Sequence, residues 1–263
     1  MPPATAELLG LPYSPWSEKA RWALDVRHVP YVSRTYAPLL GEPALRFRLK
    51  RWRGPVTVPV LRTDDGTMLA DSLDIARWAD GRGEGPALFP RGRESEVLDW
   101  VARSERGLDA GRSLSLHRML DDDDALREMV PKSLRGTLGP VGVAVGRAGV
   151  ARTLRKYGGR AEDRARHLET FVAGLEALRS ALATPPNEGG VATLLGTFTF
   201  ADVAMAQVLA FVAPPAFGLR IGHASRRAFT DDVLRERFAD LLAWRDALYE
   251  AHRPKPTPRP GRG

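Results

Sequence analysis

Ser14 is the residue whose type and position most clearly suit chemistry. It lies in a turn directly before a helix-like stretch that begins near Ser17. A serine hydroxyl at a helix start can donate a hydrogen bond to an anion, and the positive potential of the helix N-terminus adds to the stabilisation. The same position also suits an ordinary helix cap, in which the hydroxyl oxygen accepts a hydrogen bond from a helical N–H group. Ser14 is therefore a candidate site residue with two alternative roles.

Two further stretches contain candidate binding residues. The first has the features of an edge strand, and the second has those of a helix start. Val58 and Pro59 lie in a strand-like run, and a proline there is usually confined to the edge of a sheet. Asp71 and Ser72 stand at the expected start of a helix. A carboxylate there can pair with an ammonium group, and a hydroxyl with free N–H groups can hold a carboxylate. An ordinary helix cap has the same composition.

The composition excludes several kinds of chemistry. The chain of 263 residues contains no cysteine, so no disulfide, thiolate metal site or protein thiol nucleophile can form. Its five histidines include no pair at the HxxxH spacing of helical zinc sites. The acidic run at 121–124 lacks the spacing of a calcium loop and is interpreted as a solvated loop or a helix start. We therefore expect no bound metal.

The chain is strongly basic, with a formal net charge of +7 and an isoelectric point near 10.1. Its basic residues are mostly Arg, are spread along the chain and form no known nucleic-acid-binding motif, so no nucleic-acid partner is expected. Such a balance favours anionic ligands at an electropositive site. No apolar run is long enough to span a bilayer, and no leader-like segment opens the sequence. We expect a soluble, cytoplasmic protein with no membrane partner.

The hydrophobic pattern of residues 1–81 alternates between strand-like and helix-like periods in the order βαβαββα. A turn rich in Asp and Gly at 64–66 joins the last two strands into a hairpin. This order predicts a domain with a small mixed sheet covered by helices. The expected elements are strands at 6–11, 31–36, 56–62 and 67–70 and helices at 17–26, 42–52 and 71–80.

A linker at 82–94, rich in Gly, Pro and charge, precedes a helical domain. In that domain, Thr199 and Asp202 have the spacing of a capping box. Residues 131–160 are rich in Gly and basic residues and predict a helix-containing excursion that partly covers a cleft. Residues 253–263 carry four prolines and four basic residues and are expected to be a disordered tail. The helices expected in the domain of residues 95–252 lie at 94–120, 162–182, 200–212 and 231–252.

Four motifs in this order resemble the cytosolic glutathione S-transferase family. The run at 13–24 is similar to the strand-to-helix segment of the family's serine-type classes, such as tau, phi, theta and zeta. Residues 58–61 resemble the family's cis-proline strand, residues 70–75 the helix start that follows it, and residues 199–202 the capping box of its helical domain. The resemblance implies a thioredoxin-like N-terminal α/β domain followed by an all-helical C-terminal domain.

The resemblance also implies a role for each residue of the expected site. Ser14 would donate a hydrogen bond to the sulfur of glutathione and favour its thiolate. Val58, ahead of a cis Pro59, would pair through its main chain with the cysteinyl unit. Asp71 and Ser72 would hold the γ-glutamyl end. Glutathione is then a co-substrate, and its thiol attacks a small, largely apolar electrophile.

Lys50 and Arg53 are the candidates for binding the glycyl carboxylate of glutathione. The sequence departs from the family pattern in this region. Residues 52–55 replace the common Asn-Pro, Thr57 stands where many members have Lys or Arg, and Asp71 replaces Glu or Gln. These departures leave the glycine-end contacts and the class of transferase open.

Two neighbours compete with Ser14 as the donor to the thiol. Tyr13 is a candidate because other classes of the family use tyrosine, although strand alternation points it to the side opposite Ser14. Ser17 lies one turn further in. The candidate wall residues for the electrophile are His117, Tyr157, Phe211 and Phe217.

The function predicted from these residues is glutathione transfer to small electrophiles by a homodimer, the assembly usual in the family. The alternative is a non-catalytic ligand-binding or scaffold protein that keeps the fold without the chemistry. A further alternative is glutathione-dependent isomerisation, because residues 14–17 partly match the Ser-Ser-Cys-Ser pattern of the zeta class. The family's cysteine-dependent reductase branches are disfavoured, since the chain has no cysteine.

Overall fold

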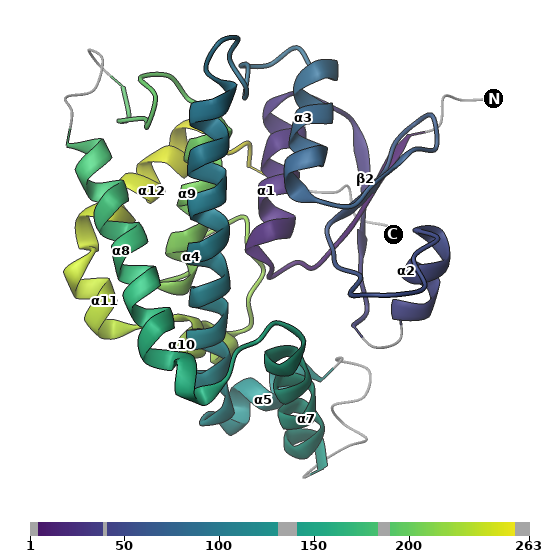
Figure 1. Cartoon of the computed structure of the whole chain (residues 1–263), viewed down its shortest axis with the longest axis vertical. Coiled ribbons are helices and arrows are strands. Elements are labelled where there is room, and N and C mark those ends of the chain that lie inside the picture. The colour runs from purple at the N-terminus through teal and green to yellow at the C-terminus, as the bar shows by residue number, and fades with distance from the viewer. Residues whose placement is uncertain (1–4, 39–40, 131–140, 184–189, 256–263) are drawn as a thin grey trace, which may run out of the picture.

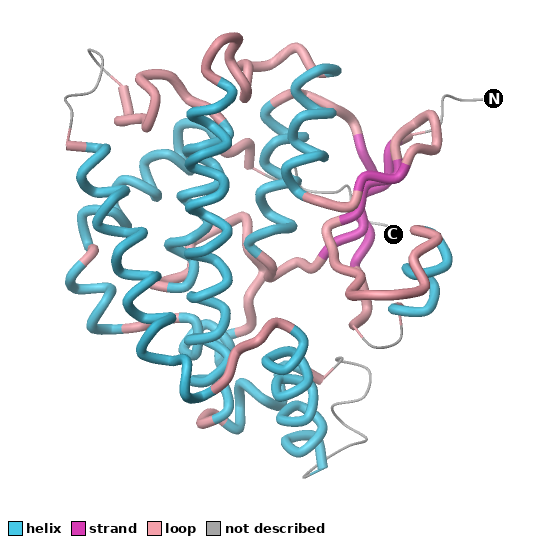
Figure 2. Tube along the Cα trace, viewed as in Figure 1, coloured by secondary structure: helices cyan, strands magenta, loops and turns pink. Residues whose placement is uncertain are grey.

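The computed structural model describes residues 5–38, 41–130, 141–183 and 190–255. Figure 1 shows two parts, a small sheet with its helices and a larger helical domain beside it. Figure 2 shows that the strands are confined to the first part. We place the boundary between the domains in the loop at 83–93, which joins helix α3 (Ser72–Arg82) to helix α4 (Glu94–Leu120).

The first domain has the predicted βαβαββα order. Its four-stranded mixed sheet has the strand order β2-β1-β3-β4, with β1 parallel to β2, β1 antiparallel to β3, and β3 antiparallel to β4. The mixture follows from the connections, because a helix carries the chain from β1 to a parallel β2, whereas a tight turn joins β3 to β4. The elements are β1 (Ala6–Gly10), α1 (Pro15–Val26), β2 (Tyr31–Thr35), α2 (Glu42–Arg48), β3 (Val60–Arg62), β4 (Met68–Leu69) and α3.

Strand β1 directs alternate side chains to the two faces of the sheet. Leu8 is buried on one face, in a cluster with Leu24 of α1 and Ile75 of α3. Leu9 packs on the other face, in the cluster that contains Leu45 of α2. Helices therefore cover both faces, and α1 lies between the sheet and the helical domain (Figure 1).

The described elements of the second domain are all helical. Helix α9 is buried at every residue and packs against the long helix α4, which also contacts α8. The predicted capping box is present, because the Asp202 carboxylate accepts hydrogen bonds from the N–H groups of Thr199 and Leu194, both at 2.8 Å. The elements that follow α4 are α5 (Asp123–Met129), α7 (Val141–Lys156), η1 (Ala161–Asp163), α8 (Arg164–Leu182), α9 (Phe200–Val208), η2 (Leu209–Phe211), α10 (His223–Phe229), α11 (Asp232–Arg237) and α12 (Ala239–His252).

Three helices differ from the sequence predictions for local reasons. The helix expected at 42–52 ends at Arg48, and Lys50 beyond it has a positive φ of 51°. The helix expected at 231–252 is two helices, α11 and α12, that meet at the fully buried Phe238. Helix α10 is not predicted by the hydrophobic pattern because its buried residues are mostly small.

The excursion expected at 131–160 contains helix α7, while residues 131–140 lie outside the described residues. The acidic run at 121–124 forms a helix start. Asp122 caps α5 by accepting hydrogen bonds from two main-chain N–H groups. The carboxylates of this run therefore lie at the positive end of a helix, where they are stabilising.

Arg253 corrects the predicted disordered tail. The sequence assigns it to the tail at 253–263, but Arg253 is 5% exposed and its guanidinium donates to Glu18 at 2.7 Å and to Asp25 at 2.6 Å. Composition alone cannot predict this anchor, because both carboxylates lie on α1, far away in the sequence. Residues 256–263 lie outside the described residues.

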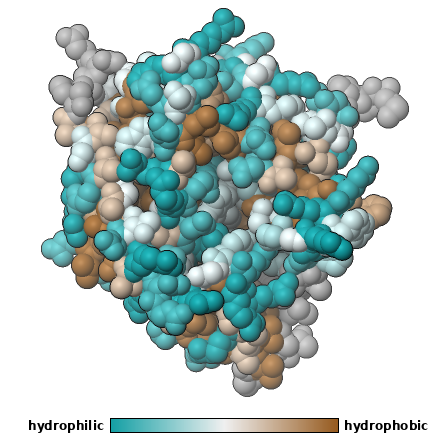
Figure 3. Space-filling view, viewed as in Figure 1, coloured by the Kyte–Doolittle hydropathy of each residue, from teal (hydrophilic) through white to brown (hydrophobic). Residues whose placement is uncertain are grey.

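Hydrophilic side chains cover most of the viewed face of the molecule, and apolar side chains form small separate patches (Figure 3). The most exposed aromatic side chains in the described part of the chain are Phe47 and Trp52, at 71% and 68%. Their rings contact each other edge to face, with centroids 6.4 Å apart. Among the described helices, none is both long and apolar enough to cross a bilayer.

Candidate active site

Ser14 is the N-cap residue of α1. Its backbone is extended, Pro15 occupies the first helical position, and the Ser14 hydroxyl oxygen accepts a hydrogen bond from the Ser17 N–H at 3.5 Å. This contact is at the long end of hydrogen-bond distances. The hydroxyl donates to no described residue, so its proton is available to a ligand at the positive end of the helix. Capping and donation are therefore compatible roles for the same hydroxyl.

The two rival donors are less accessible or harder to ionise. Ser17 is fully buried, and its hydroxyl accepts a hydrogen bond from the Leu11 N–H at 3.0 Å. Burial raises the pKa of Tyr13 to about 12. The Tyr13 phenol therefore stays protonated at neutral pH, and its hydroxyl remains a rival donor that the Tyr13→Phe variant tests.

The peptide bond between Val58 and Pro59 is cis, as predicted. Val58 is half-buried and precedes the short strand β3. Neither its N–H nor its C=O forms a hydrogen bond to a described residue. The main chain of Val58 can therefore pair with an extended peptide ligand.

Asp71 and Ser72 form the start of α3. The Asp71 carboxylate accepts a hydrogen bond from the Leu73 N–H at 2.7 Å and so caps the helix. Burial raises the pKa of this carboxyl, and the negative charge of Glu105 adds to the effect. Ser72 is only 2% exposed. The helix cap expected as the ordinary role of Asp71 is thus present, and its second carboxylate oxygen has no recorded hydrogen bond within the described chain.

Lys50 and Arg53 point away from any described partner. Both are exposed, and neither side chain forms a hydrogen bond or an ion pair with a described residue. Another lysine, which the sequence did not single out, contacts the loop that precedes Val58. Lys156, the last residue of α7, donates from its Nζ to the Val56 carbonyl at 2.8 Å. The basic end of a helix was visible in the sequence, but its contact with the loop before β3 was not.

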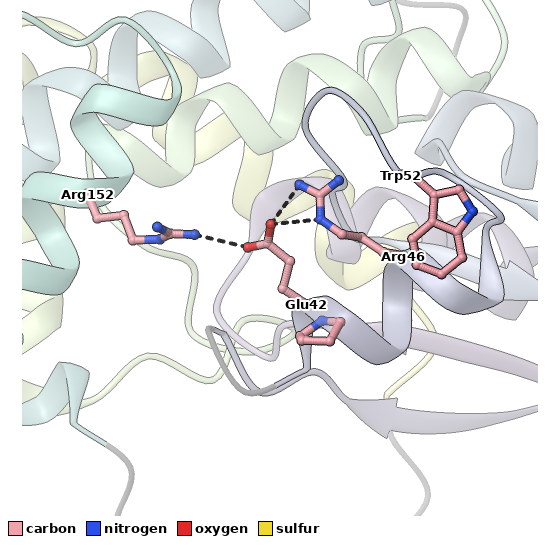
Figure 4. A pocket seen from close by; sticks show the side chains of 5 residues that line it. Glu42, Arg46, Trp52 and Arg152 are labelled. Atoms are coloured by element: carbon pink, nitrogen blue, oxygen red, sulfur yellow. Dashed lines mark hydrogen bonds and ion pairs between the residues drawn. The ribbon is translucent and has the colours of Figure 1, made fainter.

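A second contact between α7 and the first domain lies beside Lys156. Arg152 of α7 donates to Glu42 of α2 at 3.1 Å, and Arg46 donates to the same carboxylate at 2.8 Å (Figure 4). The hydrogen bond from Arg46 holds the pKa of Glu42 below its ordinary value. These side chains and Trp52 line an open hollow of about 300 Å³. With Lys156 nearby, positive charge exceeds negative charge at this junction.

Helix α1 is tied to α4 by a buried charge. Lys19 is fully buried, and its ammonium pairs with the Glu105 carboxylate of α4. The other oxygen of Glu105 accepts a hydrogen bond from the Trp16 indole at 2.7 Å. The first turn of α1, which begins at Ser14, is therefore held in place by the helical domain.

Arg112 of α4 lies over the same turn of α1. Its guanidinium carbon is 4.7 Å from the centroid of the Trp16 ring and 3.8 Å from that of Tyr157. One nitrogen donates to Asp109 at 2.6 Å. Burial lowers the pKa of Arg112, which is 17% exposed at the side chain, so its charge is poorly hydrated.

Of the expected wall residues, Tyr157 contacts Arg112, which lies over Trp16 in the first turn of α1. Phe211 is 3% exposed and contributes an edge contact to Trp16 from within the core. Phe217 packs on Tyr249 instead. The Nε2 atom of His117 is buried without a hydrogen-bond partner in the described structure. Within the described residues, no group of three or more His, Asp or Glu side chains could hold a metal ion.

The fold and the arrangement around Ser14 define a thioredoxin-like domain whose first helix, capped by Ser14, packs against a helical domain. Family models agree with this class. The model "Glutathione S-transferase, N-terminal domain" matches residues 13–82, and the model "Glutathione S-transferase, C-terminal domain" matches residues 161–247, together more than half of the chain. The chain therefore belongs to the glutathione S-transferase family.

Solved structures with the same fold are distant in sequence. A glutathione transferase from Phanerochaete chrysosporium is 19% identical, with a TM-score of 0.62 over 96% of this chain and 99% of that one. A glutathione S-transferase from Ceriporiopsis subvermispora, solved in complex with glutathione, is 17% identical, with a TM-score of 0.61 over 97% and 100%. One from Methylobacterium radiotolerans, in complex with glutathione sulfonate, is 17% identical, with a TM-score of 0.59 over 98% and 99%. No curated protein matches the chain in sequence.

The pair of Lys19 and Glu105 predicts a large stability effect. Glu105→Ala leaves a fully buried ammonium without its partner, so we expect the free energy of unfolding to fall by about 3 kcal/mol. Replacing both residues, with Lys19→Met and Glu105→Ala, should recover most of the loss because no charge is then buried. Urea unfolding monitored by circular dichroism measures these changes.

Glu96 provides the matched control on the same helix. It pairs with Arg93 at 2.7 Å, but both side chains are more than 40% exposed. Glu96→Ala should therefore cost less than about 1 kcal/mol. The contrast between the two pairs is the buried Lys19, because the Glu105 side chain is 39% exposed. A Glu105→Ala protein as stable as the Glu96→Ala protein would show that the pair of Lys19 and Glu105 does not hold α1 to α4.

Proposed function

We propose that this protein is a cytoplasmic glutathione transferase in which the Ser14 hydroxyl stabilises the thiolate of bound glutathione. The observation that carries the proposal is the position of Ser14 at the positive end of α1 with a hydroxyl proton that no described residue accepts. Membership of the glutathione S-transferase family supports glutathione as the ligand.

The energy required is within reach of this arrangement. A glutathione thiol has an unperturbed pKa near 8.5, so little thiolate exists at neutral pH. Lowering that pKa by two units takes about 2.7 kcal/mol of preferential stabilisation of the anion. A hydrogen bond to an anion contributes about 1.5–3 kcal/mol, and the helix N-terminus adds about 0.3–1 kcal/mol. No proton transfer to serine is needed.

The remaining contacts would hold the rest of the peptide. The unpaired main chain of Val58, ahead of Pro59, suits the cysteinyl unit, and the helix start at Asp71 and Ser72 suits the charges of the γ-glutamyl end. For the glycyl carboxylate we propose Lys156, because its ammonium already lies at the Val56 carbonyl. Lys50 and Arg53, the candidates from the sequence, are exposed and would have to turn toward the peptide.

The thiolate would attack a small electrophile placed on the side of the helical domain. The rings of Trp16 and Tyr157 offer apolar surface next to the first turn of α1. The reaction needs one new carbon–sulfur bond and the departure or saturation of the electrophilic group, with no metal or protein thiol. The alternative of a non-catalytic scaffold is supported by the departures from the family pattern at the glycine end, at residues 52–55 and Thr57.

The thiolate role of Ser14 is tested by Ser14→Ala. We expect the pKa of bound glutathione to rise by about one to two units, because the hydrogen bond to the anion is lost. Turnover at neutral pH should fall about ten- to hundredfold where thiolate formation limits the rate. The affinity for glutathione should change much less, since Val58, Asp71 and Ser72 are intact. Thiolate absorbance against pH, together with turnover of chlorodinitrobenzene, gives both readouts.

Tyr13→Phe is the matched control for this experiment, because it removes a neighbouring hydroxyl. It should leave the pKa of bound glutathione unchanged. A large shift in Tyr13→Phe with none in Ser14→Ala would transfer the catalytic role to Tyr13. Glutathione binding without turnover in the unmodified protein would favour the scaffold function.

We further propose that the protein is a homodimer. The edge-to-face pair of Phe47 and Trp52 exposes two aromatic rings in the first domain, which is the kind of surface that a subunit interface buries. Light scattering at micromolar concentration should give about twice the chain mass of 28.9 kDa. Phe47→Ser with Trp52→Ser should shift the mass toward that of one chain. A single-chain mass for the unmodified protein would contradict the proposal.

A further inference from the structure

Arg112 is a cation in contact with two aromatic rings. Its guanidinium carbon lies over the Trp16 ring of α1 at 4.7 Å and over the ring of Tyr157, directly after α7, at 3.8 Å. The side chain is 17% exposed. A planar guanidinium stacked in this way is pre-organised and loses little freedom when it binds a ligand.

Most of the hydrogen-bonding capacity of Arg112 is unused. A guanidinium carries five N–H donors, and the described structure records one hydrogen bond for Arg112, from Nη2 to Asp109. None of its nitrogens is fully buried without a partner. The unused donors are therefore open to a ligand. Asp109 is 60% exposed at the side chain, so water screens its charge and it neutralises Arg112 incompletely.

The position of Arg112 assigns it to the electrophile and not to glutathione. Trp16, over which it lies, is two residues beyond Ser14 in the first turn of α1. The other two cations nearby have other roles, because Lys19 is fully buried against Glu105 and Lys156 is the residue proposed for the glycyl carboxylate of glutathione.

We propose that the electrophile site selects small planar substrates that carry a carboxylate, and that Arg112 binds this group. This inference rests on the proposed transferase function and replaces the expectation of largely apolar substrates. The faces of Trp16 and Tyr157 supply the apolar contact for a flat substrate. The paired donors of the guanidinium match the two oxygens of a carboxylate.

A chloronitrobenzoate and the corresponding chloronitrobenzamide form a suitable pair of probes. They differ in the charge of one group and share the same reaction. The thiolate sulfur bonds to the ring carbon that bears chlorine, and the carbon–chlorine bond breaks as chloride leaves with its electron pair. The proton of the thiol passes to water. Each kcat/KM is divided by the uncatalysed rate constant of the same compound, which removes the difference in intrinsic reactivity.

Arg112→Met is the informative variant. It should lower the normalised kcat/KM for the benzoate about ten- to hundredfold and change that for the benzamide less than about threefold. Arg103→Met is the matched control, because Arg103 lies on the same helix, stacks over Trp100 at 5.2 Å and is exposed. It removes the same charge from the chain and should change neither substrate by more than about twofold.

The possible results separate this inference from the proposed function. Equal losses for benzoate and benzamide in Arg112→Met would assign the residue to packing and overturn the inference while the transferase function stands. Turnover of chlorodinitrobenzene but of neither probe would overturn the inference and leave the transferase function standing, whereas turnover of none of the three compounds would overturn both.

A competition experiment on the unmodified protein does not depend on the folding of a variant. Nitrobenzoate should inhibit turnover of chlorodinitrobenzene at a concentration at least tenfold lower than nitrobenzamide does. Equal inhibition by the two compounds would contradict carboxylate selection.

Discussion

Two fully buried charges at the centre of α1, Glu18 and Lys19, constrain how the two domains fit together. A buried ion without a partner costs several kcal/mol, so each needs an opposite charge. Lys19 meets Glu105 of α4. Glu18 meets Arg21 of its own helix and Arg253 at the end of the described chain, each at 2.7 Å. Glu105 lies early in the sequence of the helical domain and Arg253 lies at its end. Their contacts fix helix α1 between the sheet and the helical domain. Because Ser14 caps this helix, its hydroxyl takes its position from the same pairs.

The expected glutathione site draws on elements from both domains. The first domain supplies the helix N-terminus and the unpaired main chain of Val58. The helical domain supplies Arg112 from α4 and Lys156 from α7. A positive helix end and two nearby cations all favour an anion, whether it is a thiolate or a carboxylate. One electrostatic arrangement thus accounts for both the proposed thiol activation and the proposed substrate preference.

The parts of the site that depend on local sequence were predictable, and those that depend on long-range contacts were not. The turn at Ser14 and the capping box at Asp202 each follow from a few adjacent residues, and the cis bond before Pro59 was implied by the resemblance to the family. Arg112 and Lys156 gain their roles only because α4 and α7 pack against distant segments, and a single sequence does not reveal which helix faces meet. Arg253 shows the same limit. Its neighbours predict disorder, and its burial follows from carboxylates that are more than two hundred residues away.

The central claim is that glutathione binds with its sulfur at Ser14, and a crystal structure of the complex tests it most directly. The account predicts the sulfur within about 3.5 Å of the Ser14 hydroxyl oxygen. It also predicts the cysteinyl main chain paired with Val58, the γ-glutamyl end at Asp71 and Ser72, and the glycyl carboxylate within reach of Lys156. A sulfur that lies against the Tyr13 phenol, or a peptide bound away from the first turn of α1, would contradict the account.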